Sequence, residues 1–302
     1  MTIAQGSILV AGAINTDLVA SVTRAPAAGE TVTGSGFSIH GGGKAANQAV
    51  AIARSEGDAY LVGAIGDDVF GHARLIDLIR DGVHTASVME STGQPSGVAL
   101  ILVEDGGENR IAYVPGATLT MPQAHMKAAF SEIQPSIVLA TNELPHNVLR
   151  VLFTAARNAG ATVVFNVTPE PETARDLIRD VSILIVNSGE AATLLEIEEI
   201  VDTEDAVASL LKLGPGTVIL TLGPDGACFG TRNELAWHRP PGVDVVDTTG
   251  AGDTFCGAFV AELARSATID DAVRYGVVAS ALSVTRKGAQ SSIPTRSEIL
   301  GR

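Results

Sequence analysis

The sequence predicts an α/β fold in which helices cover a mostly parallel central sheet. From residue 137 onward, short apolar segments alternate with longer segments of helical periodicity, which is the pattern of successive strand–helix units. The short segments are continuously apolar, as strands are when both of their faces are covered. Of the 302 residues, 46% are apolar and 18% are charged, so the chain can bury a sizeable core and is not a disordered polymer.

The first half of the chain supplies the beginning of this sheet and a second, smaller sheet. In chain order we expect a strand at 7–11, a strand at 31–40, a helix at 44–54, a strand at 60–64 and a helix at 69–80. The segment 97–114 predicts a β-hairpin, because alternating apolar residues flank a polar turn. Together with residues 20–22 and 31–39, this hairpin is expected to form a small antiparallel sheet beside the main domain.

The second half continues the parallel sheet. The expected strands cover 137–140, 162–165, 183–186 and 217–221. The expected helices cover 146–158, 203–213, 252–264 and 270–284. Parallel neighbours joined through helices predict right-handed crossovers. The sequence contains no internal repeat and no obvious linker, so residues 1–302 are expected to form a single domain.

The net charge limits the classes of binding partner, and the cysteines indicate the cellular compartment. With 20 Lys+Arg against 34 Asp+Glu, the net charge is -14, so no nucleic-acid partner is expected and an anionic ligand needs a local positive site or an accompanying cation. No apolar run is long enough to span a bilayer, so no membrane partner is expected. Two cysteines, Cys228 and Cys256, cannot form a disulfide framework, and the N-terminus does not read as a signal peptide; both favour a cytoplasmic location.

The segment DTTGAGDTF, residues 247–255, is the strongest chemical signal in the chain. Glycines at 250 and 252 allow the backbone to approach a ligand closely, and an apolar helix begins directly after them. Amides at such a helix start form an anion site, and Asp253 lies in the first turn beside it. A carboxylate there suits removal of a proton from a hydroxyl that attacks bound phosphate. A capped helix after a glycine turn is the alternative interpretation.

Two further segments indicate a polyhydroxyl ligand. In GGGKAANQ, residues 41–48, Lys44 and Asn47 lie one helical turn apart behind three glycines. Asn15 and Asp17 follow the first strand, at the sheet end where α/β proteins bind ligands. Amide, carboxylate and ammonium groups together match the donors and acceptors of hydroxyl groups. Taken alone, the first segment is as consistent with a capped helix and a solvated lysine, and the second favours an Asx turn.

Together these motifs resemble the ribokinase family of carbohydrate kinases, also called the PfkB family. The stretch GGGKAANQAVAIARSEGDAYLVGAIGDDVFG is similar to the N-terminal signature of the family, and DTTGAGDTFCGAF is similar to its C-terminal signature. AINTDLV, GETVTG, SGVALILV and VTRKGAQSS also match at corresponding spacing. The resemblance extends from about Ser7 to about Pro294, and chance agreement of several ordered motifs is very improbable.

The resemblance implies a ribokinase-like fold, a three-layer α/β/α sandwich with a small β-sheet lid. The lid is expected from two separate stretches of the single domain, about 18–40 and 97–115. In the family this lid also forms a dimer contact, so a homodimer is the expected assembly. A closing lid excludes water, which would compete with the sugar for the phosphoryl group.

The resemblance also assigns roles to individual residues. Asp253 matches the catalytic base, with the amides of Gly250, Ala251 and Gly252 as the anion hole. The sugar-binding positions are matched by Asn15, Asp17, Gly43, Lys44, Asn47 and Glu143. The nucleotide positions are matched by Asn187, Glu190, Thr221, Gly223 and Gly226. A site for an activating monovalent cation is matched by Asp247, Thr249, Ser283, Arg286, Gly288 and Ser292.

The implied activity is that of an ATP-dependent carbohydrate kinase. It would transfer the γ-phosphoryl group of ATP, bound with Mg²⁺ and supported by K⁺, to the 5-hydroxyl of D-ribose. Deoxyribose, fructose or a nucleoside stays open as the acceptor, since Ala45 and Val277 depart from the family pattern beside the sugar and the adenine. A non-catalytic protein that senses sugar or nucleotide is disfavoured by the intact base and anion hole. A nicotinamide dehydrogenase is disfavoured because no GxGxxG follows the first strand.

Overall fold

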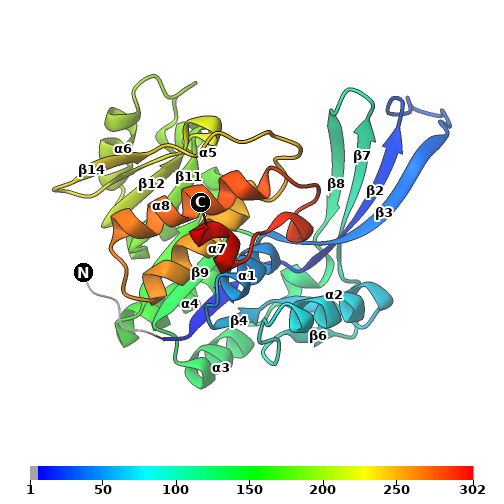
Figure 1. Cartoon of the computed structure of the whole chain (residues 1–302). Helices are drawn as coiled ribbons and strands as arrows, with labels where there is room; N and C mark the ends of the chain where they lie inside the picture. Colours follow the sequence, from blue (N-terminus) through cyan, green and yellow to red (C-terminus); the bar gives the residue numbers. More distant parts are fainter. Residues whose placement is uncertain (1–5, 302) are drawn as a thin grey trace.

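An eight-stranded sheet forms the centre of the computed structural model, which describes residues 6–301 (Figure 1). From one edge to the other, its strands are β14 (Leu235–His238), β13 (Ala227–Gly230), β12 (Thr217–Thr221), β11 (Ile183–Asn187), β10 (Thr162–Asn166), β9 (Ile137–Thr141), β1 (Ile8–Ala11) and β4 (Ala59–Val62). Strands β12 to β4 are all parallel, whereas β13 and β14 add antiparallel pairs at one edge.

Helices cover both faces of this sheet. One face packs against α1 (Lys44–Arg54), α2 (Val69–Arg80), α7 (Ala251–Ala264) and α8 (Ile269–Ser283). The other face packs against α3 (Gln123–Ile133), α4 (His146–Ala159), α5 (Ser188–Leu195) and α6 (Thr203–Leu211). A short α9 (Arg296–Leu300) packs on α8, and 3-10 turns occupy Gly116–Thr120, Pro171–Asp180, Gly223–Asp225 and Gln290–Ser292. The result is the three-layer α/β/α sandwich that the sequence predicts.

The two-residue period of the strands explains these two cores. Ile8 and Val10 of β1 belong to the core on the α1 and α7 side, whereas Leu9 and Ala11 belong to the core on the α4 side. All four side chains are fully buried, as expected for a strand covered on both faces. This burial leaves the strand ends, rather than the sheet faces, free to carry polar groups.

A second, four-stranded sheet projects away from the central one, with its blue and teal strands at the right of Figure 1. Its strands, in order, are β3 (Gly34–Gly42), β2 (Asn15–Val22), β7 (Gly97–Glu104) and β8 (Asn109–Val114). The expectation of a purely antiparallel sheet is wrong, since β2 and β7 pair in parallel. The two strands enter the sheet from separate parts of the chain, which frees them from the antiparallel direction that a hairpin turn imposes.

Other differences from the expected elements are local. The predicted strand at 60–64 is divided at Gly63 into β4 and β5 (Ala64–Gly66), and β5 pairs in parallel with β6 (Met89–Ser91) outside the central sheet. Helices α3 and α5 were not predicted from the sequence. Among residues 6–301, no helix combines the length and apolarity needed to cross a bilayer.

Candidate active site

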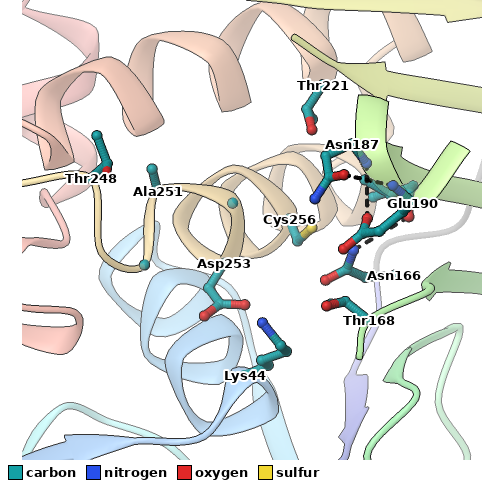
Figure 2. A pocket seen from close by; sticks show the side chains of 13 residues that line it. Lys44, Asn166, Thr168, Asn187, Glu190, Thr221, Thr248, Ala251, Asp253 and Cys256 are labelled. Carbon is teal, nitrogen blue, oxygen red and sulfur yellow. Dashed lines mark hydrogen bonds between the residues drawn. The ribbon is translucent and has the colours of Figure 1, made fainter. Parts of the chain in front are cut away.

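A polar cavity of about 150 Å³ opens where parallel strands of the central sheet end and α7 begins (Figure 2). Asn166, Asn187 and Thr221 are the last residues of β10, β11 and β12, so three strand ends contribute side chains. The carboxyl edge of a parallel sheet is where α/β proteins bind their ligands. The lining residues are Lys44, Asn166, Thr168, Ile185, Asn187, Glu190, Thr221, Thr248, Gly250, Ala251, Gly252, Asp253 and Cys256.

Asp253 lies in the first turn of α7 and is 8% exposed. Its Oδ2 accepts a hydrogen bond from Asn47 Nδ2 at 2.9 Å, and its Oδ1 accepts one from Gln48 Nε2 at 3.0 Å. Burial raises the pKa of this carboxyl, although the charge of Lys44 and the two amide donors oppose the rise. A carboxylate that is oriented on both oxygens and made more basic by burial is suited to accept a proton.

The start of α7 offers amide groups to an anion. Gly250 precedes the helix with φ +75°, and no side chain of residues 6–301 caps the helix start. The Ala251 N–H donates to the Thr248 carbonyl at 3.2 Å, and its contribution to an anion hole stays a prediction. Within the described chain, no acceptor is found for the N–H groups of Gly252 and Asp253, which lie at the positive end of the helix dipole.

Lys44 supplies positive charge to the same cavity. It is the first residue of α1, and its side chain lies beside Asp253 in Figure 2. Burial disfavours the ammonium form, but the charges of Asp253, Glu143 and Glu190 outweigh burial and raise the pKa of Lys44. Lys44 therefore stays protonated and provides the local positive site that an anionic ligand needs in so acidic a chain.

Asn187 and Glu190 form a capping box at the start of α5. Glu190 Oε2 accepts the Asn187 N–H at 2.8 Å, and Asn187 Oδ1 accepts the Glu190 N–H at 2.9 Å. Both side chains line the cavity (Figure 2). Burial raises the pKa of Glu190, against the opposing hydrogen bond from the Asn187 amide and the charge of Lys44. The NxxE pattern thus places an amide and a carboxyl group opposite the α7 helix start.

The predicted sugar residues lie at the base of the four-stranded sheet, next to this cavity. Asn15 and Asp17 belong to β2, so the Asx-turn interpretation is wrong. Burial raises the pKa of Asp17, with the charges of His40 and Arg74 opposing it. The Oδ1 atoms of Asn15 and Asn47 are buried and find no hydrogen-bond partner among the described residues. Such atoms are available to the hydroxyl groups of a ligand.

The Glu143 carboxylate links two backbone segments through hydrogen bonds. Its carboxylate accepts hydrogen bonds from Thr141 Oγ1 at 2.7 Å, Ala13 N at 2.9 Å, Lys44 N at 3.1 Å and Ala45 N at 3.3 Å. These donors come from three separate parts of the chain. Glu143 therefore holds the turn after β1 against the glycine loop before α1. Its direct contact with a sugar stays a prediction.

Gly43 makes the close approach of these segments possible, and Gly43→Ala is expected to destabilise the fold by about 2–6 kcal/mol. Gly43 has φ +89°, and an added Cβ would lie 2.5 Å from the Ala13 carbonyl oxygen. The estimate adds about 1–3 kcal/mol for the unfavourable dihedral to about 1–3 kcal/mol for overpacking. Urea denaturation measures it. Gly93→Ala is the matched control, because no atom of residues 6–301 outside its chain neighbours lies within 4 Å of its added Cβ. Equal midpoints for both variants would contradict this expectation.

The predicted nucleotide turn follows β12 directly. Thr221 lines the cavity, whereas Gly223 and Gly226 lie farther along the turn that joins β12 to β13. Gly226 has φ +92°, and an added Cβ would lie 1.9 Å from the His238 carbonyl oxygen. Only glycine fits this position without displacing β14. The contact with β14 therefore constrains the backbone of this turn, which begins beside the cavity at Thr221.

The predicted cation-site residues lie on the loop before α7, at the end of α8 and in the segment that follows α8. Asp247 Oδ1 accepts the Thr249 N–H at 2.9 Å and its hydroxyl at 2.7 Å, and Asp247 Oδ2 accepts the Gly288 N–H at 2.8 Å. Burial opposes these hydrogen bonds, but they outweigh it and lower the pKa of Asp247. The structure thus brings Asp247, Thr249 and Gly288 together. The other predicted residues make different contacts: the Ser283 and Ser292 hydroxyls donate to Ser280 and Ala289, and Arg286 pairs with Glu298.

Several site residues were not predicted from the sequence. Gln48 holds Asp253, and Asn166, Thr168, Ile185, Thr248 and Cys256 line the cavity. Two of these residues could have been found from the sequence: Gln48 directly follows Asn47 on α1, and Asn166 directly follows the parallel strand predicted at 162–165. Ala45 and Val277, which depart from the family pattern, are buried in the core on the α1 side.

A buried carboxylate, a protonated lysine and an open helix start around one cavity define a class of protein, the phosphotransferases that act on a hydroxyl group. The chain belongs to the PfkB family of carbohydrate kinases, since the model of that family matches residues 5–296. The resemblance seen in the motifs is therefore confirmed over nearly the whole chain.

Individual relatives agree with this assignment. The ribokinase of Schizosaccharomyces pombe is 38% identical over 308 residues, covering 98% of this chain and 97% of the relative. The structure of Arabidopsis thaliana ribokinase complexed with ribose and ATP has a TM-score of 0.90 at 30% identity, over 98% of both chains. The ribokinase of Cryptococcus neoformans in complex with ADP has a TM-score of 0.86 at 31% identity, over 98% of this chain and 99% of the other.

Proposed function

We propose that the protein is an ATP-dependent sugar kinase that transfers the γ-phosphoryl group of ATP to the 5-hydroxyl of D-ribose. The observation that carries the proposal is the placement of Asp253 between the sugar-side residues of α1 and the open start of α7. A nucleotide at the strand ends and a sugar below the four-stranded sheet would meet at this carboxylate. The similarity to ribokinases along the full chain supports ribose as the acceptor.

In the proposed reaction, Asp253 accepts the proton of the sugar hydroxyl. The hydroxyl oxygen then bonds to the γ-phosphorus, the bond from that phosphorus to the bridging oxygen breaks, and ADP leaves. The amides of Gly252 and Asp253 and the ammonium of Lys44 stabilise the negative charge on the transferred group. The chain needs no covalent intermediate, because its residues supply orientation and charge.

The donor atoms of the site fit a divalent and a monovalent cation. The carboxylate of Glu190 and the side-chain oxygen of Asn187 are the hard oxygen ligands that Mg²⁺ prefers, directly or through water. Bound Mg²⁺ supplies neutralisation of phosphate charge, which suits an acidic chain. For K⁺, Asp247 fixes the backbone of its own loop and of the loop at Gly288, and backbone carbonyls there are the proposed ligands.

The four-stranded sheet is the proposed lid and the proposed dimer contact. Leu18 lies directly opposite Ile39 on one side and Leu100 on the other, so the three side chains share one face. Ile39 and Leu100 remain 48% and 49% exposed. A second copy covering this face would bury a continuous apolar surface. A cytoplasmic location, where ATP is available, completes the proposal.

The test is ADP production from Mg–ATP with purified protein. We expect ribose-dependent turnover that rises with K⁺, and in competition we expect ribose to be preferred over 2-deoxyribose, fructose and adenosine. Preference for another acceptor would keep the mechanism and change the substrate. Bound nucleotide without turnover of any acceptor would overturn the proposal in favour of a sensing protein.

A further inference from the structure

Gln48 connects Asp253 to the central sheet. It lies on α1, is 0% exposed, and uses its single amide nitrogen twice. Gln48 Nε2 donates to Asp253 Oδ1 at 3.0 Å and to Asn166 Oδ1 at 3.0 Å. Asn166 Nδ2 in turn donates to the Ile185 carbonyl of β11 at 3.3 Å. A continuous chain of hydrogen bonds therefore runs from two parallel strands to the carboxylate.

This series of hydrogen bonds allows only one assignment of donors and acceptors. Since Asn166 Nδ2 donates to a backbone carbonyl, Asn166 Oδ1 faces Gln48 and accepts. The Gln48 amide must then present its nitrogen to both oxygens, because the opposite orientation would place Gln48 Oε1 against two acceptors. The fixed backbone of the sheet thus determines the orientation of the Gln48 side chain.

Asn47 does not have this constraint. Asn47 Nδ2 donates one hydrogen bond, to Asp253 Oδ2, whereas Gln48 Nε2 donates two. The side-chain oxygens of both residues are buried and have no partner among the described residues, so the second hydrogen bond of Gln48 is what distinguishes it. The Asn47 amide is free to adjust to a ligand or to the protonation of Asp253. Helix packing also favours Gln48 as the fixed contact. The Cβ that Gly257 lacks would lie 2.4 Å from the Gln48 carbonyl oxygen, so α1 and α7 approach closely at this residue.

We propose that Gln48 is the positioning residue of the catalytic base: it holds Asp253 Oδ1 so that Oδ2, shared with the adjustable Asn47, faces the acceptor hydroxyl and takes its proton. This inference rests on the proposed kinase function. It separates two neighbouring residues of one motif by their amide nitrogens, since Gln48 Nε2 donates to both Asp253 and Asn166 whereas Asn47 Nδ2 donates to Asp253.

The test is Gln48→Met, which keeps the length of the side chain and removes its donor. We expect kcat to fall by about 10- to 100-fold, the effect of losing one hydrogen bond to a charged group, with little change in KM for either substrate. The acid limb of the kcat profile should move to higher pH, because a lost donor leaves the carboxylate less stabilised. Gln48→Glu places a second carboxyl beside Asp253 and should move that limb farther.

Two further variants separate positioning from general damage. Ser182→Ala removes a half-buried acceptor from Val163 N at the other end of β10 and should leave the pH profile unchanged. Asn166→Ala removes the partner that orients Gln48, so its effect should not add to that of Gln48→Met in the double variant. Asn166→Ala also carries the test by itself if Gln48→Met fails to fold, since it leaves Gln48 in place.

The outcomes distinguish this proposal from the proposed function. A Gln48→Met enzyme with the wild-type pH profile, or with its loss entirely in KM, would overturn the positioning role while ribose phosphorylation by the wild type stands. Additive effects of the two variants would also overturn it. A wild-type protein that phosphorylates no acceptor would overturn the proposed function itself, and the positioning role would fall with it.

Discussion

Asp253→Asn is expected to lower kcat by about 10²–10⁴-fold, the contribution of a general base, while the protein remains folded. The substituted amide can be accommodated because Asn47 has an unpartnered Oδ1 that can turn to accept from it. Gln48 can keep donating to the remaining side-chain oxygen. Nucleotide binding, which depends on the strand ends and the helix start, should persist.

The same substitution is expected to stabilise the protein at neutral pH. Burial raises the folded-state pKa of Asp253 above its ordinary value of 3.8, so the folded state binds the proton more tightly than the unfolded chain does. Burial of the Asp253 carboxyl group therefore lowers the free energy of unfolding as the pH rises from the pKa of the unfolded state through the pKa of the folded state. The Asp253→Asn variant carries no charge at this position, so its melting temperature should equal or exceed that of the wild type at neutral pH. This advantage should disappear near pH 3.8 and below.

Steady-state kinetics and thermal melts across this pH range measure both effects. Asp176→Asn, on the exposed surface of the 3-10 turn Pro171–Asp180, is the matched control and should change neither. Retained turnover in Asp253→Asn would remove Asp253 from the role of base. A marked loss of stability at neutral pH would instead show that the carboxylate is a structural partner of Asn47 and Gln48.

Lys44→Met is the second variant with a large expected effect, a fall in kcat of about 10²–10³-fold, the effect of removing one preorganised donor to developing charge. Lys44 is the only basic residue among those that line the described cavity. Its loss leaves the carboxyl groups of Asp253, Glu143 and Glu190 without their shared counter-charge. The pKa of Asp253 and that of Glu190 should rise, so the acid limb of activity should move to higher pH.

Initial rates against Mg–ATP and against ribose, each over a pH series, test this expectation. KM for Mg–ATP should rise, because the local positive site is lost. Lys127→Met, on the exposed face of α3, is the control for removing one positive charge from the chain. An unchanged KM for Mg–ATP together with an unchanged acid limb would show that Lys44 acts only through the packing of α1.

Local patterns were sufficient where one short segment determines the structure. The helix at Lys44–Arg54 and the helix at Val69–Arg80 have the predicted bounds, since each has an apolar face of helical period and a clear start. The parallel strands were predicted because both of their faces are buried. The division of 60–64 into β4 and β5 was not predicted, because it depends on pairing with β6 far along the chain.

The sequence by itself determined the fold class and the residues that can take part in catalysis or binding, including Asp253, Lys44 and the glycines before α1 and α7. These follow from composition, period and motif, which act within a few turns of chain. Only the tertiary structure decided which groups meet. Gln48 and Asp253 are 205 residues apart, and their contact depends on the packing of α1 against α7. The Ala251 N–H donates to the Thr248 carbonyl, and the Glu143 carboxylate accepts four hydrogen bonds. These partners are set by how the loops fold against one another, so no local sequence pattern can assign them.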